Sequence, residues 1–191
     1  IEGTAKRLER FNHDDIRYML YPWGPSERKK LPGFQALHGL KGAAICEAEI
    51  VRGIAKGLYL TAPKISGATA DIDTDIAAKT TATLNMLKEH DFVLTHFNGA
   101  DEAAHRYDYH GKAEFISAID KEFLEKVINN IQEPLRIVIC GDHVTSSVTG
   151  KHNKNAVPVV AAQINTAAIP VTINNYQDIL TFLMRASDMR G

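Results

Sequence analysis

The chain has 191 residues, of which 45% are hydrophobic and 24% are charged, and its formal net charge is −1. This composition is sufficient for one hydrophobic core of ordinary domain size, and the near-neutral charge gives no electrostatic reason to expect nucleic acid or an anionic membrane as a partner. No apolar run approaches the roughly 20 residues that a membrane-spanning helix requires.

The first part of the chain differs in pattern from the rest. Residues 3–20 mix charged positions with spaced apolar ones, which predicts a surface helix followed by a short extended segment. Pro and Gly residues between Tyr21 and Gly33 then interrupt regular structure. We therefore predict a domain boundary in this stretch, between residues 25 and 26.

From residue 40 onwards, predicted strands and helices alternate. Runs of apolar residues predict strands over 40–46, 91–97, 135–140 and 157–162, with a short interrupted strand within 58–65. Apolar positions three or four residues apart predict helices over 48–58, 73–89, 111–130 and 176–186. In the second of these helices the expected buried residues are Ile76, Thr80, Leu84 and Leu87. This alternation is typical of the α/β class, so we expect a largely parallel sheet with helices on both faces.

The two cysteines bear on the cellular compartment, and the first residue bears on whether the chain is a fragment. Cys46 and Cys140 lie in apolar, strand-like runs, and we expect both to be reduced core thiols, which favours the cytoplasm. The chain begins with Ile1 rather than Met, and its first predicted element looks like one from within a domain rather than the start of one. We expect a fragment of a longer protein, with ordinary processing as the alternative.

An acidic residue and a histidine follow the predicted strand 91–97. Asp101 and His105 are four positions apart, so a helix or helical turn would place both side chains on one face. A carboxylate and an imidazole on one face can hold a divalent cation. Taken alone, such a spacing is more often an ordinary pair on a helix surface.

A second acid and two more histidines follow the predicted strand 135–140. Asp142 and His143 come directly after Gly141, and His152 lies shortly beyond. Open α/β sheets bind ligands at the carboxyl edge of their strands, which is where these side chains are expected. If Asp142 and His143 lie on a loop, they can reach two different metals. Together with the first pair, they predict a metal centre built on strand ends.

Two neighbouring metals hold an anionic substrate, activate a hydroxyl nucleophile and stabilise charge on a leaving oxygen, as in phosphoryl transfer. Such a site also needs a Ser or Thr nucleophile and usually a further carboxylate. Thr145, Ser146 and Ser147 lie beside the predicted centre, but nothing in the pattern marks one of them as a nucleophile. We expect loop hydroxyls or hydrogen-bond donors to the metal ligands at these positions.

These motifs resemble those of a known family. Asp-Glu-Ala-Ala-His at 101–105, Cys-Gly-Asp-His-Val-Thr at 140–145 and the following His152 resemble the metal-binding half of the alkaline phosphatase superfamily. They are more similar still to the archaeal-type cofactor-independent phosphoglycerate mutases. Further stretches similar to that family are Tyr21–Gly24, Gly39–Ala43, Gly67–Thr69, Asp73-Thr74 and Val157-Pro158. The resemblance runs from about residue 18 to the last predicted strand.

The resemblance implies a fold, a reaction and a set of ligands. The fold would be an alkaline-phosphatase-like core, and the reaction would interconvert 3-phosphoglycerate and 2-phosphoglycerate through a phosphoserine enzyme, without 2,3-bisphosphoglycerate as cofactor. Asp101, His105 and His152 match the ligands of one divalent metal. Asp142 and His143 match two ligands of a second, and the ions used in the family are Mn²⁺, Mg²⁺ or Zn²⁺.

The chain also departs from the family pattern. The nucleophilic serine and one aspartate of the second metal site belong to the N-terminal part of the family's proteins, and nothing in this chain matches them. By this resemblance, residues 1–25 correspond to a remnant of an inserted substrate-binding domain and residues 26–191 to part of the metal-binding core. We expect the chain to be a C-terminal fragment that is inactive alone.

Three other residues are candidates for supporting roles. Lys41 is a candidate contact for the substrate phosphate or carboxylate, and the alternative is a solvated lysine at a strand end. His96 and Thr145 are candidates for hydrogen bonding to the metal ligands. Two other functions stay open on the sequence: another metal-dependent phosphohydrolase of the same superfamily, and a non-catalytic metal-binding domain.

Overall fold

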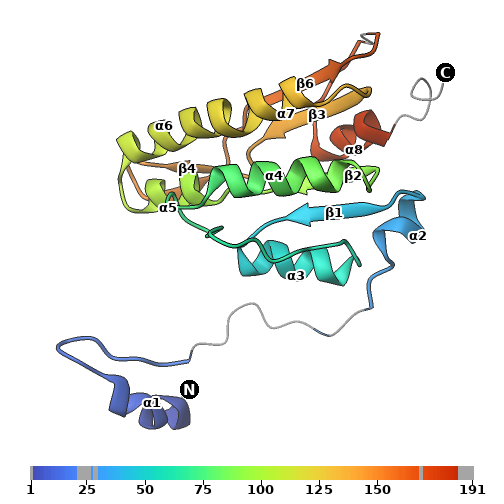
Figure 1. Cartoon of the computed structure of the whole chain (residues 1–191). Helices are drawn as coiled ribbons and strands as arrows, with labels where there is room; N and C mark the ends of the chain where they lie inside the picture. Colours follow the sequence, from blue (N-terminus) through green and yellow to red (C-terminus); the bar gives the residue numbers. More distant parts are fainter. Residues whose placement is uncertain (1, 21–26, 28–29, 168–169, 185–191) are drawn as a thin grey trace. The chain divides into compact units, whose positions relative to one another are not determined.

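The computed structural model describes residues 2–20, 27, 30–167 and 170–184 (Figure 1). Trp23 and the rest of the predicted motif at 21–24 therefore lie outside the described residues, as do residues 185 and 186 of the last predicted helix. The chain divides into two compact units, Ile1–Leu31 and Pro32–Gly191. The predicted boundary at 25/26 falls where residues are not described, and the identification of the first unit as part of an inserted domain stays a prediction.

The first unit is small and leaves its apolar side chains in solvent. It contains α1 (Glu2–Leu8) and a 3₁₀ turn, η1 (Glu9–Phe11), and so regular helix ends well before residue 20. The chain then makes a turn closed by a bridge between His13 and Ile16, and Asn12 accepts a hydrogen bond from the backbone N–H of Tyr18. Phe11 and Met19 are more than half exposed, so this unit has little core of its own.

The second unit is built around a parallel pair of strands, one buried and one half-buried. β1 (Gly42–Ile45) pairs with β2 (Phe92–Thr95), and all four residues of β1 are buried. Successive side chains of a strand point to opposite faces. Ala44 and Cys46 pack against Ala55 of α3 (Glu49–Gly57) on one face, and α4 (Ile76–Leu87) lies on the other side of β1 in Figure 1. The α/β class and the helices on both faces of a parallel pair are confirmed.

The buried face of α4 differs from the predicted one. Its fully buried residues are Ile76, Lys79, Thr80 and Thr83, whereas Leu84 and Leu87 are only half-buried. Each threonine hydroxyl donates to the carbonyl four residues back, which satisfies its polar group inside the helix and lets it be buried. The helix begins at Ile76 because Asp75 caps it by accepting a hydrogen bond from the backbone N–H of Ala78.

The other described strands pair antiparallel, so the parallel pairing among the described strands is that of β1 with β2. β3 (Leu135–Cys140) pairs with β6 (Val159–Ile164), and β4 (Val144–Ser146) pairs with β5 (Lys151–Asn153). Parallel neighbours need a crossover connection, usually a helix. Between β3 and β6 the chain instead forms the β4–β5 hairpin and returns from the same end, which makes the pair antiparallel.

The other helices complete the unit. Their bounds are α2 (Phe34–His38), α5 (Gly99–His105), α6 (Tyr109–Ala118), the π-helical turn η2 (Ile119–Leu124), α7 (Glu125–Asn130) and α8 (Tyr176–Met184). The single helix predicted over 111–130 is thus the continuous run from α6 through η2 to α7 (Figure 1). The predicted strand within 58–65 is reduced to one parallel bridge between Thr61 and Ala43. Within the described ranges, every helix is too short or too polar to cross a lipid bilayer.

Candidate metal centre

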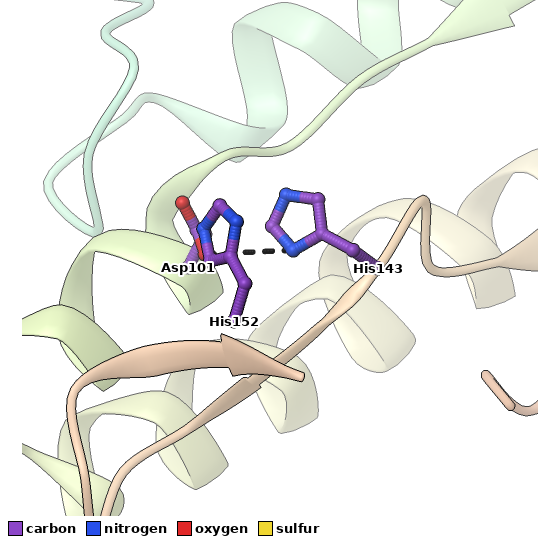
Figure 2. Close-up of side chains that lie close together, drawn as sticks. All are labelled: Asp101, His143 and His152. Atoms are coloured by element: carbon purple, nitrogen blue, oxygen red, sulfur yellow. Dashed lines mark ion pairs between the residues drawn. The ribbon is translucent and has the colours of Figure 1, made fainter. Parts of the chain in front are cut away.

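Four predicted ligands converge from three different elements. Asp101 and His105 lie on α5, His143 lies in the turn between β3 and β4, and His152 lies on β5. Figure 2 shows Asp101, His143 and His152 pointing toward one another, and one ligand atom of each lies within 4.8 Å of the others. This convergence depends on the β4–β5 hairpin, which carries His152 back to the end of α5.

Asp101 lies at the centre of this group. Its Oδ2 is 3.4 Å from Nε2 of His105, and its Oδ1 is 3.6 Å from Nε2 of His152 and 3.9 Å from Nδ1 of His143. The Nε2 atoms of His105 and His152 are 3.1 Å apart. The rings of His143 and His152 stack with centroids 4.0 Å apart. A carboxylate and three imidazoles therefore share one small volume.

Hydrogen bonds fix which nitrogen of His105 is free. Its Nδ1 is 2.8 Å from the backbone carbonyl oxygen of Gly150, and a carbonyl oxygen can only accept. Nδ1 therefore carries the hydrogen, and in the neutral ring Nε2 keeps its lone pair. That lone pair points at Asp101 and His152. The tautomer with its hydrogen on Nδ1 is the one that a histidine needs in order to bind a metal through Nε2.

The same reasoning applies to His143. Thr145 is buried, and its hydroxyl donates to Oδ1 of Asp101. Since a hydroxyl has one hydrogen, it must accept from Nδ1 of His143, 3.1 Å away. The free nitrogen of His143 is therefore Nε2, which lies 3.6 Å from Oδ2 of Asp142.

Asp142 itself lies at the margin of the group. Its side chain is 74% exposed, against 23% for Asp101. One of its oxygens accepts from the backbone N–H of His143. The structure therefore brings Asp101, His105, His143 and His152 together and leaves Asp142 beside them, in contact with His143 alone among the ligands.

The position of α5 is fixed by the segment that precedes α4. Gly99, the first residue of α5, lies against this segment so closely that an added Cβ would be 2.7 Å from the backbone nitrogen of Ile72. The amide of Asn98 donates to the carbonyl of Ala70. Both terminal nitrogens of the Arg106 guanidinium donate to the carboxylate of Asp71, at 2.7 and 2.6 Å. Contacts at both ends of α5 thus hold the helix that carries Asp101.

Comparison with known proteins agrees with this geometry. Residues 7–179 match the family model described as the metalloenzyme superfamily. The chain belongs to the metalloenzyme superfamily. The name of that superfamily implies metal binding, and the carboxylate and imidazole donors gathered around Asp101 are consistent with it.

Curated relatives of this superfamily member come from archaea. A 2,3-bisphosphoglycerate-independent phosphoglycerate mutase of Methanococcus vannielii is 36% identical over 82% of this chain and 38% of its own length. The protein of the same name from Methanopyrus kandleri is 32% identical, over 80% of this chain and 36% of its own length. The chain therefore spans less than two fifths of the length of these relatives.

A solved structure supports the fold. A protein from Pyrococcus horikoshii shares 29% sequence identity with this superfamily member and superposes with a TM-score of 0.66, over 69% of this chain and 40% of the other. About two thirds of this chain therefore has the same arrangement as part of a larger known protein.

His96 lies between the strand pair and the metal centre. Its backbone N–H donates to the carbonyl of Ile45, at the end of β1. Its Nδ1 is buried and has no hydrogen-bond partner among the described residues. Burial lowers the pKa of His96, and the negative charge of Asp142 only partly opposes this effect. His96 is thus a largely buried, neutral imidazole beside the centre, without a direct contact to a predicted ligand in the described part of the chain.

A buried lysine, Lys79, was missed by the sequence pattern. Its side chain is 1% exposed, its Nζ donates to the backbone carbonyl of His96, and Nζ lies 4.4 Å from the ring centroid of Phe97. Burial lowers the pKa of Lys79 to about 8, while the negative charge of Glu47 and the thiol of Cys46 oppose the shift. The sequence pattern missed residue 79 because helical periodicity was taken from apolar residues, and a lysine does not count among them.

The depressed pKa of Lys79 predicts a pH-dependent stability. Between about pH 8 and the ordinary lysine pKa of 10.5, the unfolded chain holds a proton that the folded chain does not. The free energy of unfolding of the wild type should therefore rise with pH in this window, relative to Lys79→Met, by about 1–2 kcal/mol between about pH 7.5 and pH 9.5. Urea denaturation of both proteins at these two pH values measures this difference. A constant difference between them would contradict the depressed pKa.

Lys41 lies away from the metal centre. It immediately precedes β1, and its backbone N–H donates to the carboxylate of Asp91, just before β2. The two strands are parallel, and α5 follows the carboxyl end of β2. Lys41 is therefore at the opposite end of a strand pair about 13 Å long. This position does not support the predicted contact between Lys41 and substrate.

Cys140 also differs from its prediction. Both cysteines are free thiols, as expected, and Cys46 is buried. Cys140 is exposed, because it is the last residue of β3, a strand that has a described partner on one side only. The apolar run that contains Cys140 indicated a strand but could not show which of its ends is covered.

Proposed function

We propose that this chain is the metal-binding part of a cofactor-independent phosphoglycerate mutase, an isomerase that interconverts 3-phosphoglycerate and 2-phosphoglycerate in glycolysis. The observation that carries the proposal is the convergence of Asp101, His105 and His152 on one point. It occurs in a chain whose archaeal relatives bear the name of this enzyme. The substrate class, a small phosphorylated acid, follows from that name.

The donor set fits two divalent cations. Oδ2 of Asp101 and the free Nε2 of His105 are 3.4 Å apart, beside Nε2 of His152, and this group forms the first site. The free Nε2 of His143 and the exposed carboxylate of Asp142 form part of the second site. Mn²⁺, Mg²⁺ or Zn²⁺ suits these ligands. When bound, the ions supply positive charge against phosphate oxygens and a deprotonated hydroxyl.

Thr145 links the two groups of ligands. Its hydroxyl donates to Asp101 of the first site and accepts from His143 of the second. Its backbone carbonyl accepts from Nζ of Lys112, at 2.8 Å, which anchors the strand to α6. Hydrogen bonds of this kind set the orientation and tautomer of metal ligands. We propose that Thr145 fixes the spacing of the two sites. We also propose that His96, which follows β2, supports the metal ligands by hydrogen bonding.

The proposed activity needs residues that this chain does not supply. Asp142 is largely exposed and contacts only His143 among the ligands, as expected for a ligand whose other partners come from elsewhere. By resemblance to the family, those partners are a nucleophilic serine and a further aspartate, in the part of the relatives that this chain does not match. The free thiols support a reducing compartment, and we propose the cytoplasm.

The purified chain should show no mutase activity. A longer protein that also contains the part with the nucleophilic serine and the further aspartate should be active. The measurement is the conversion of 2-phosphoglycerate to 3-phosphoglycerate followed by ³¹P NMR in the presence of Mg²⁺, which is diamagnetic. The longer protein carrying Asp142→Ala is the control for background turnover.

Two outcomes would change the proposal. Mutase activity of residues 1–191 alone would show that the second site is complete without further ligands. A longer protein that hydrolyses a simple phosphate ester, such as p-nitrophenyl phosphate, but does not interconvert the phosphoglycerates would instead be a metal-dependent phosphohydrolase.

A further inference from the structure

The turn between β3 and β4 carries Asp142 and His143 but lies outside the strand ladders. β3 ends at Cys140 and β4 begins at Val144, so the pairing registers do not include the residues between them. The side chains of Asp142 and His143 contact each other, at 3.6 Å. The geometry of this turn therefore depends on hydrogen bonds from other parts of the chain.

Tyr176, far away in the sequence, supplies two such hydrogen bonds. Its hydroxyl lies 2.9 Å from the backbone carbonyl oxygen of Asp142 and 3.2 Å from that of Gly141. A phenol has one hydrogen, which it shares between two successive carbonyls, with the shorter contact to Asp142. The peptide that joins Asp142 to His143 contains that carbonyl. Holding it limits the rotation that would turn the His143 ring away from Asp142.

Tyr176 acts from a well-anchored helix. It is the first residue of α8, and the carboxylate of Asp178 accepts from the backbone N–H of Asn174 and of Asn175 at the start of that helix. Further along, Phe182 is 5% exposed, and its carbonyl accepts from Arg136 of β3. The helix is thus fixed at both ends, and the tyrosine hydroxyl has a defined position relative to β3.

We propose that Tyr176 is a positioning residue for the second metal site, where its hydroxyl holds the Gly141–Asp142 backbone so that the Asp142 carboxylate and Nε2 of His143 face the same cation. This inference rests on the proposed metal-binding function. Tyr176 is not one of the proposed metal ligands, and it is 54% exposed. Its effect on binding comes through the backbone that it restrains.

The test is Tyr176→Phe in the 191-residue chain, which removes one hydroxyl and keeps the ring. Zn²⁺ is titrated while the imidazole resonances of His143, His105 and His152 are followed by NMR. Loss of one hydrogen bond to a ligand-bearing turn should weaken the Zn²⁺ response of His143 about three- to tenfold. The responses of His105 and His152 should be unchanged. Amide hydrogen exchange at 141–144 should become faster, and the thermal unfolding midpoint should not change.

Tyr109→Phe is the matched control. Tyr109 is also the first residue of a helix and is similarly exposed, at 62%. Its hydroxyl forms no hydrogen bond within the part of the chain that the structure describes. This variant should behave as the wild type does in all three measurements.

The outcomes separate this inference from the proposed function. If no histidine of the wild type responds to Zn²⁺, the proposed function is wrong and the inference falls with it. If His105 and His152 respond but His143 does not, the first site stands and the inference is wrong. An unchanged His143 response, or unchanged exchange at 141–144, in Tyr176→Phe would likewise overturn the role of the hydroxyl.

Discussion

Replacement of Asp101 by Asn should abolish tight binding of Mn²⁺ at the proposed first metal site. Asp101 is the carboxylate that faces both other ligands of this site, at 3.4 Å from His105 and 3.6 Å from His152. Asn keeps the shape of the side chain but removes its negative charge. Loss of a hydrogen-bond partner behind a metal ligand typically costs 10- to 100-fold in affinity, so loss of a ligand should cost at least about 100-fold.

The measurement is isothermal titration of the purified chain with Mn²⁺, together with the shift of the unfolding midpoint at a saturating concentration of the metal. A cation that binds only the folded state stabilises it by mass action, so the wild type should show a shift that Asp101→Asn lacks. Asp120→Asn is the matched control, because Asp120 is exposed on the π-helical turn η2. Equal affinity of the wild type and Asp101→Asn would exclude the first site.

The second large effect concerns the backbone that carries Asp101. Gly99→Ala should destabilise the chain by about 2–3 kcal/mol, because the added methyl group overpacks a well-filled contact. Its Cβ would lie 2.7 Å from the backbone nitrogen of Ile72 and 2.8 Å from the carbonyl carbon of Asp71. Backbone atoms cannot move aside as a flexible side chain can, so α5 must shift away from this segment.

Gly53→Ala is the internal contrast for this prediction. Gly53 lies within α3 and is exposed, and an added Cβ would meet no atom within 4 Å. An Ala in a helix interior is more favourable than a Gly by about 0.5–1 kcal/mol, so this variant should be more stable than the wild type. Urea denaturation measures both free energies. Gly99→Ala should also weaken Mn²⁺ binding. Wild-type stability and affinity in Gly99→Ala would show that the contact with the 71–72 backbone is not needed.

Local patterns predicted most of the elements of this protein. Three of the apolar runs predicted as strands (40–46, 91–97 and 135–140) contain β1, β2 and β3, and the fourth (157–162) overlaps the first part of β6. The three- and four-residue spacing over 111–130 lies within one continuous helical run. Strand ends are also local features, because Gly141 and the polar residues after it interrupt an apolar run. The sequence could therefore place Asp101, His105, Asp142 and His143 just beyond strands without any knowledge of the pairing.

The partners of these elements could not be predicted in the same way. The antiparallel pairing of β3 with β6 depends on the β4–β5 hairpin between them, whose strands of three residues each are too short for a periodicity to identify. The same hairpin carries His152 back to His105. Burial of Lys79 depends on the carbonyl of His96, which lies just beyond β2 and far from Lys79 in the sequence.

By itself, the sequence determined the α/β class, the order of the main elements, the candidate donor residues and a resemblance to a metal-dependent family, because each of these depends on residue type and on spacing along the chain. The tertiary structure alone decided which donors meet. It joined Asp101 to His105 and His152, turned the free nitrogen of His143 toward Asp142, placed Lys41 at the far end of the strand pair and brought Tyr176 to the Asp142 backbone. Distances between residues far apart in the sequence are set by how helices and strands pack, and hydrogen-bond directions follow from those distances.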